Sequence, residues 1–278
     1  MIVKKKTIWT PIARVLQYGL LVGLAAVMLI PFAWQLATSF KPVSEIEGGS
    51  FFPQHSQGLV NYREVFEINF GRYFFNSVFM ASWVAFLQVF TSAMAAYAFS
   101  RIDWPGRDKV FMLYLATLMI PGIVLMIPNF WVITKLGMLN TYRGLIIPAA
   151  FTAGGTFLLR QFMLGLPRSL DEAAEIDGAT RWQIFWEIIL PMARPGLITL
   201  AIFTFLGTYQ SFFWPLVIVK DDYLRNLPLG LLAFQSQYST QTNVLMAAAV
   251  ITMIPPVILF LVGQRFFTQG IRLGAVKG

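Results

Sequence analysis

The sequence contains no cysteine, so it can form neither a disulfide framework nor a thiolate metal site. Its single histidine, His55, lies in a polar stretch and is read as a solvated side chain rather than as a ligand or a base. No Gly-x-x-x-x-Gly-Lys-[Ser/Thr] loop occurs, which excludes the usual way of binding ATP. Only 12% of the residues are charged and 57% are hydrophobic, whereas about a quarter of the residues in soluble domains are charged. This low charge and high hydrophobic content exclude an ordinary soluble domain.

Long apolar segments predict an all-α polytopic membrane protein. A helix needs about 20 mostly apolar residues to cross a bilayer. Residues 1–278 therefore form a single membrane domain with six predicted transmembrane helices, at approximately 15–39, 74–99, 110–134, 143–163, 195–219 and 243–263. The first is too long for the roughly 7–15-residue apolar core of a signal peptide, so we expect it to be retained.

Basic residues predict the orientation of these spans. Placing both termini in the cytoplasm puts most of the 21 lysines and arginines on that side, as the positive-inside rule requires. The net charge of +8 is dispersed over the span ends, which favours membrane topology over nucleic-acid binding. The segment 164–194 then faces the cytoplasm. We expect a multi-pass protein of the inner (plasma) membrane.

The predicted spans contain neutral polar groups but no ionisable residue in their cores. An ion-coupled carrier typically needs such a residue at membrane depth, so its absence weighs against that class. Amide, hydroxyl and aromatic groups suit a neutral polyhydroxylated solute, although they also join helices to one another. The candidates for lining a solute pathway are Gln88, Thr208, Tyr209, Gln210 and Ser211.

The segment 164–194 has the pattern of two short helices in series. Ser169 and Glu172 predict a capping box at the start of the first helix, and Gly178 a left-handed residue after its end. Thr180 and Gln183 predict a second capping box, and a proline at 191 is expected to stop the second helix. The first helix is small and acidic, with a flat apolar stripe at Leu170, Ala173 and Ala174, and predicts a docking surface for a soluble partner. The second carries an apolar stripe at Trp182, Phe185, Trp186 and Ile189, and is expected to lie on the bilayer interface or to pack under the bundle.

Seven of these positions form a recognisable pattern: Glu172, Ala173, Ala174, Gly178, Ile188, Leu190 and Pro191. The pattern resembles the EAA loop of permease subunits in binding-protein-dependent ABC importers. The C-terminal Gln264-Arg265-Phe266-Phe267 and the end from Gly270 to Gly278 resemble the carbohydrate branch, in particular the shorter permease of maltose-type importers. The order of spans and loops agrees with this resemblance over essentially the whole chain.

The resemblance implies a non-catalytic subunit that forms half of a sugar pathway. Its implied partners are a second, homologous permease in a heterodimer, two cytoplasmic ABC ATPase subunits and an extracytoplasmic solute-binding protein. The ATPases would bind ATP-Mg, so this chain needs no cofactor or metal. The implied coupling residues are Glu172, Ala173, Ala174, Asp177 and Gly178. Three alternatives stay open: an ABC permease for a non-sugar solute, a stand-alone secondary carrier or channel, and an integral-membrane enzyme.

Overall fold

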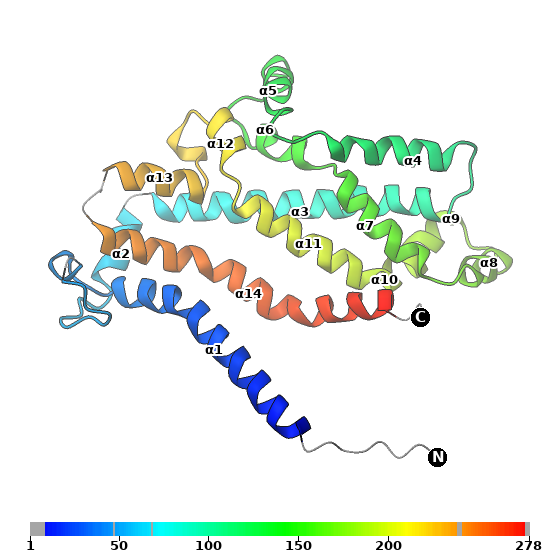
Figure 1. Ribbon diagram of the computed structural model, residues 1–278. Coiled ribbons are helices and arrows are strands. Elements are labelled where there is room, and N and C mark those ends of the chain that lie inside the picture. Colours follow the sequence, from blue (N-terminus) through cyan, green and yellow to red (C-terminus); the bar gives the residue numbers. More distant parts are fainter. Residues whose placement is uncertain (1–8, 47, 68, 238–240, 276–278) are drawn as a thin grey trace. The chain divides into compact units, whose positions relative to one another are not determined.

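The computed structural model describes residues 9–46, 48–67, 69–237 and 241–275. Throughout this described part the regular secondary structure is helical, with no strand (Figure 1). The chain divides into two compact units, the first formed by residues 1–68 and 234–252 and the second by residues 69–233 and 253–278. Part of the tail motif, 276–278, and the lysines at 4–6 lie outside the described residues.

A buried asparagine organises the first unit. This unit contains α1 (Trp9–Thr38), η1 (Val43–Glu45), α2 (Val60–Glu67) and the beginning of α14 (Thr242–Ala275). Asn61 of α2 is fully buried and donates to the backbone oxygens of Ser39 and Lys41 at 2.8 and 3.0 Å. Its own side-chain oxygen accepts a hydrogen bond from Asn243 at 2.8 Å. One amide therefore connects α2 with the end of α1 and the start of α14.

The second unit is built on α3 (Phe70–Ser100), against which α7 (Ala153–Leu164) and α11 (Arg194–Tyr209) pack (Figure 1). Small side chains allow this close approach, as is usual between membrane helices. A Cβ on Gly155 of α7 would lie 2.7 Å from the hydroxyl oxygen of Ser92. A Cβ on Gly196 of α11 would lie 2.7 Å from the ring of Phe162. Larger residues at these two glycines would force the helices apart.

Shorter helices complete the second unit around this core. In chain order these are α4 (Arg107–Ala116), η2 (Thr117–Met119), α5 (Met126–Lys135), α6 (Tyr142–Ile146), η3 (Ile147–Ala149), α8 (Ser169–Ile176), α9 (Arg181–Gln183), η4 (Ile184–Ile189), α10 (Leu190–Met192), α12 (Phe213–Ile218), η5 (Asp222–Leu224) and α13 (Leu227–Gln237), which continues into the first unit. Figure 1 shows α8 and α9 at the C-terminal end of α3, with α6 and α12 toward its other end.

The described helices agree only in part with the predicted spans. Three helices are long and apolar enough to cross a membrane: Ala13–Thr38, Phe70–Ser100 and Thr242–Gln264. Two bent pairs raise this number to five, namely Tyr142–Ala149 with Ala153–Leu164, at 44°, and Arg181–Met192 with Arg194–Tyr209, at 74°. The second pair joins the 164–194 loop to the start of the predicted fifth span. The total of six spans therefore stays a prediction.

Three predicted spans are interrupted, and one of them is 143–163, in which η3 ends at Ala149 and α7 begins at Ala153. Proline accounts for the interruption in the segment 110–134. The segment 110–134 was expected to be one helix, but α4 and η2 end at Met119 and α5 begins at Met126. Ile120 is extended, at φ −85° and ψ 116°, because the ring of the following Pro121 disfavours the helical conformation there. The segment 195–219 was also expected to be one helix, but it breaks between Tyr209 and Phe213.

Candidate functional site

The first helix of the 164–194 loop is α8, and its C-terminal turn follows the prediction. Gly178 has a φ of +83°. The N–H of Gly178 bonds the carbonyl of Glu175 at 3.1 Å, and that of Ala179 bonds the carbonyl of Ala174 at 2.9 Å. These two bonds form a Schellman motif, which satisfies the carbonyls that a helix end leaves free. The motif confirms the predicted left-handed residue.

The predicted capping box at the start of α8 is wrong. Ser169 is already the first helical residue, and the N-cap residue is Arg168, which makes no side-chain capping bond. The backbone carbonyl of Arg168 accepts from the N–H of Glu172 at 3.2 Å, so the turn begins one residue earlier than predicted. A serine inside the helix cannot occupy the extended N-cap conformation that the capping box needs.

The second helix starts as predicted but ends later. Thr180 and Gln183 form the capping box, with bonds of 3.3 Å from the Gln183 N–H and 2.8 Å from the Thr180 N–H. The helix passes through a π-helical stretch, Ile184–Ile189, and ends at Met192 rather than at Pro191. The wider π turn accommodates a proline that has no N–H to offer the preceding turn.

One side of this helix pair packs into the bundle. Ala174, Phe185 and Ile189 belong to a buried cluster with Tyr97 of α3 and Met163 of α7. The second helix is therefore anchored by half of its predicted apolar stripe. The other half, Trp182 and Trp186, is 56% and 43% exposed.

The opposite side of α8 is open. Glu172, Ala173, Asp177 and Gly178 are exposed, and Ile176 is 86% exposed. The predicted coupling residues therefore form a small, acidic surface with short side chains, except that Ala174 faces the bundle. Such a surface can fit into a cleft of another protein.

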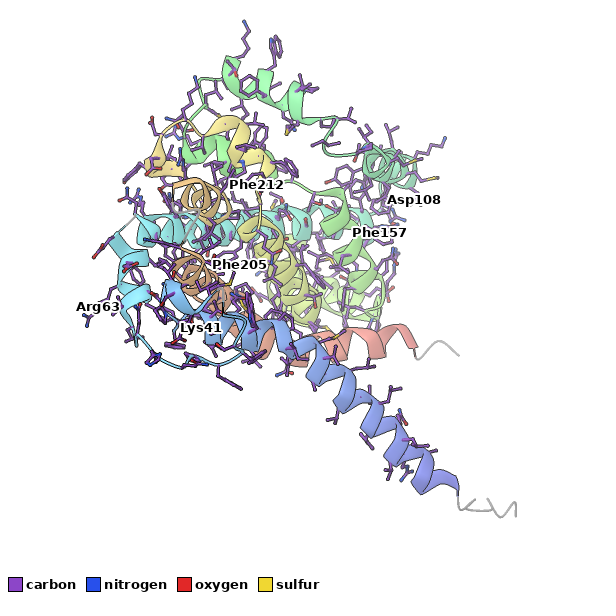
Figure 2. The ribbon with its side chains drawn as sticks, turned by 60° about the vertical axis from the view of Figure 1, so that its left-hand side comes forward. Lys41, Arg63, Asp108, Phe157, Phe205 and Phe212 are labelled. Carbon is purple, nitrogen blue, oxygen red and sulfur yellow. The ribbon has the colours of Figure 1, made fainter. Side chains whose placement is uncertain are left out.

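A second candidate site is a cavity of about 750 Å³ at the break between α11 and α12. It is lined by residues of that break, of the segment 122–129 and of α6 and η3. Three of the five predicted pathway residues line it, namely Thr208, Gln210 and Ser211. Figure 2 shows Phe205 on α11 and Phe212 just beyond the end of that helix. The cavity offers hydroxyl, amide and aromatic groups without a charged residue in its lining.

Gln88 and Tyr209 are not in this lining. Tyr209 is 1% exposed, and its ring stacks on Phe205 with the centroids 5.8 Å apart. The Gln88 amide donates to the carbonyl of Ala149 at 2.7 Å and accepts from the hydroxyl of Thr204 at 2.8 Å. Gln88 therefore joins helices, which is the alternative role considered for such groups.

Asn129 of α5 also lines the cavity, although it was not among the pathway residues predicted from the sequence. It is the only asparagine in the segment 110–134, and this was the signal that could have identified it.

A side-chain hydrogen bond holds the break between α11 and α12: the amide of Asn226 donates to the carbonyl of Ser211 at 2.6 Å. Non-helical backbone at membrane depth is tolerated where it has such partners or lines a cavity.

Comparison with known proteins identifies the family. Residues 88–273 match the model of the binding-protein-dependent transport system inner membrane component. The chain is 35% identical to the arabinooligosaccharides transport system permease protein AraQ of Halalkalibacterium halodurans, over 99% of this chain and 100% of that one. It is also 35% identical to the trehalose/maltose transport system permease protein MalG of Thermococcus litoralis, over 92% and 94%.

The fold agrees with a solved structure. A chain of a bacterial ABC transporter involved in the import of the acidic polysaccharide alginate superimposes with a TM-score of 0.83 at 24% identity, over 92% of this chain and 97% of that chain. This likeness concerns the arrangement of the helices. The match over residues 88–273 and the 35% identity to AraQ show that the chain belongs to the family of inner membrane components of binding-protein-dependent transport systems.

Proposed function

We propose that this chain is the permease subunit of a sugar ABC importer and forms half of its translocation pathway. The observation that carries the proposal is the exposed α8, which bears the EAA pattern and ends in the left-handed Gly178. Relatives named as permeases for arabinooligosaccharides and for trehalose or maltose support a carbohydrate as the solute. Its partners are a second, homologous permease, two cytoplasmic ATPases that bind ATP-Mg, and an extracytoplasmic solute-binding protein.

In this proposal α8 seats in a cleft of an ATPase subunit. Glu172 is exposed and supplies a negative charge for a basic group of the ATPase, while the short side chain of Ala173 allows close approach. Asp177 and Gly178 lie at the exposed turn, and Ala174 packs α8 against the permease itself. ATP-driven closure of the two ATPases then moves the coupling helices and changes the side to which the pathway opens. Both termini lie in the cytoplasm in this arrangement.

The cavity beside the break between α11 and α12 is the proposed part of the pathway. Its volume of about 750 Å³ lies within the range of small-molecule sites, roughly 300–1,000 Å³. Hydroxyl and amide groups of Thr208, Gln210, Ser211 and Asn129 can exchange hydrogen bonds with sugar hydroxyls, and Trp214 offers an aromatic face. Irregular backbone at this position resembles the broken helices that line transporter sites.

Reconstitution tests the proposal against a stand-alone carrier. Vesicles containing this chain alone should not accumulate arabinooligosaccharides, trehalose or maltose. Vesicles that also contain the second permease and the ATPases should take up one of these solutes when ATP and the binding protein are supplied. Uptake by the chain alone would identify a carrier or channel and would contradict the proposal.

A further inference from the structure

The side chain of Arg101 joins three helices at the end of α3 that adjoins α8. Arg101 is the residue directly after α3, and its side chain is 3% exposed. One guanidinium nitrogen donates to the carboxylate of Asp171, in the first turn of α8, at 2.6 Å. The other donates to the backbone carbonyls of Leu166, at 3.0 Å, and Met163. Met163 lies in the last turn of α7 and Leu166 just beyond its end, where the helix dipole favours a cation.

Few other contacts hold α8 in place. Among its residues only Ala174 is buried, and alanine offers little apolar surface. The carboxylate of Asp171 is 18% exposed, so its pair with Arg101 is shielded from salt. The neighbouring pair between Arg168 and Asp103 is longer, at 3.5 Å, and 56% and 69% exposed. Surface pairs of that kind contribute little, so the Arg101–Asp171 pair is the main polar attachment of α8.

The same end of α3 also holds the second helix of the loop. The hydroxyl of Tyr97, one turn before Arg101, donates to the backbone carbonyl of Arg181 at 3.0 Å. The ring of Tyr97 lies against that of Phe185, with the centroids 5.1 Å apart. Both helices of the loop are thus attached to one end of the central helix of the unit.

We propose that the Arg101–Asp171 pair is the latch that positions α8 on the bundle and passes its displacement to α3 and α7. Arg101 and Asp171 are positioning residues in this role, because they act through α8 and not on the solute or on ATP. The inference rests on the proposed function, since it specifies how movement of the coupling helix reaches the predicted spans. Arginine suits the role because its planar fork reaches acceptors on two helices at once, which a lysine does not.

Three variants of the full transporter complex test the latch. Asp171→Ala breaks the attachment of α8 while leaving the bonds from Arg101 to α7 in place. It should retain ATPase copurification but lose roughly tenfold in the stimulation of ATP hydrolysis by the loaded binding protein, a typical coupling effect. Asp171→Asn keeps an oxygen acceptor and should retain most of the stimulation. Arg168→Gln, which removes the neighbouring exposed pair, is the matched control and should behave as the unaltered protein. Full stimulation in Asp171→Ala, or an equal loss in Arg168→Gln, would overturn the latch.

A distance measurement tests the same latch without any transport activity. The chain has no cysteine, so spin labels can be attached to single cysteines placed at exposed Trp83 of α3 and Ile176 of α8. The distribution of label distances should broaden in Asp171→Ala and stay narrow in Arg168→Gln. An unchanged distribution in Asp171→Ala would refute the latch even if the complex transports sugar. The two proposals can also fail separately. If the distance distribution broadens in Asp171→Ala but the unaltered chain binds no ATPase, the latch is supported and the proposed function is contradicted.

Discussion

The hydroxyl of Thr204 on α11 donates to the side-chain oxygen of Gln88 on α3 at 2.8 Å. The amide nitrogen of the same glutamine donates to the carbonyl of Ala149 at 2.7 Å. One side chain thus connects three elements of the second unit, and both of its polar atoms have protein partners. A membrane-buried amide is costly without such partners, so we assign Gln88 to stability rather than to solute contact.

The first prediction is that Gln88→Leu lowers the stability of the protein in detergent. The change removes two hydrogen bonds and leaves the carbonyl of Ala149 without this donor, and we expect a loss of about 1–2 kcal/mol. Thr204→Val should cost less, because it removes one bond. Thermal unfolding of the two single variants and the double variant gives the coupling between them, for which we expect about 0.6 kcal/mol. Strict additivity would show that the two side chains do not interact.

The second prediction concerns docking. Glu172→Lys should abolish copurification of the ATPase subunits while the chain still inserts in the membrane. Reversing one partner of a charge pair that docking buries costs about 3–5 kcal/mol, enough to dissociate most complexes. Glu187→Lys makes the same change at an exposed position of the second helix and is the control. Normal copurification and ATPase stimulation in Glu172→Lys would remove Glu172 from the coupling role.

The third prediction concerns Gly178, where a substitution could be unfavourable through a steric clash of the new side chain or through backbone strain. A Cβ at this position would meet no atom within 4 Å, so the penalty comes only from the φ of +83°. Gly178→Val should therefore impair coupled transport more than Gly178→Asn, because asparagine tolerates the left-handed conformation and a β-branched residue does not. Gly154→Ala, whose new Cβ would make only ordinary contacts, is the control. Equal transport by the valine and asparagine variants would show that the turn does not matter for coupling.

The fourth prediction distinguishes two adjacent residues of the broken helix. A cysteine at Gln210, which lines the cavity, should react with a water-soluble thiol reagent, whereas one at Tyr209, which is 1% exposed, should not. Labelling measured by mass shift, with and without nucleotide, checks this expectation. A cysteine at 210 that reacts in neither state would place the residue in a helix interface.

The fifth prediction compares a cavity residue with a residue between helices. We expect Gln210→Ala to change the apparent solute affinity, or the stimulated ATPase activity, more than Thr204→Ala does. The reason is that Gln210 lines the cavity, whereas the hydroxyl of Thr204 is directed to Gln88. Uptake measured over a range of solute concentrations tests this order. A larger change in affinity for Thr204→Ala would reverse the assignment.

The sequence correctly predicted features that depend on residues close to one another in the chain. The Thr180 capping box and the left-handed Gly178 depend on residues within a few positions of one another, and both are confirmed. The error at Ser169 has the same origin. A capping pattern does not decide whether the turn begins at the serine or one residue before it, and here the helix had already begun.

Hydrogen bonds between residues far apart in the chain could not be predicted from the sequence. The break after α11 is held by Asn226, which bonds the carbonyl of Ser211, and nothing local to the apolar segment 195–219 reveals that partner. The bond from Arg101 to Asp171 joins residues that are 70 positions apart. In the sequence Arg101 is recognisable only as a basic residue at the end of a predicted span, because its role depends on how α3, α7 and α8 meet.

The bend of 74° between Arg181–Met192 and Arg194–Tyr209 has a mechanical consequence. The joint is Ala193, which is 1% exposed. Its N–H bonds the carbonyl of Ile189 at 2.9 Å, and its carbonyl accepts from Leu197 at 3.1 Å. Backbone hydrogen bonds on both sides of Ala193 therefore connect the two helices through this bend. Under the proposed function, a displacement of Arg181–Met192 would therefore reach α11, the helix that ends at the cavity.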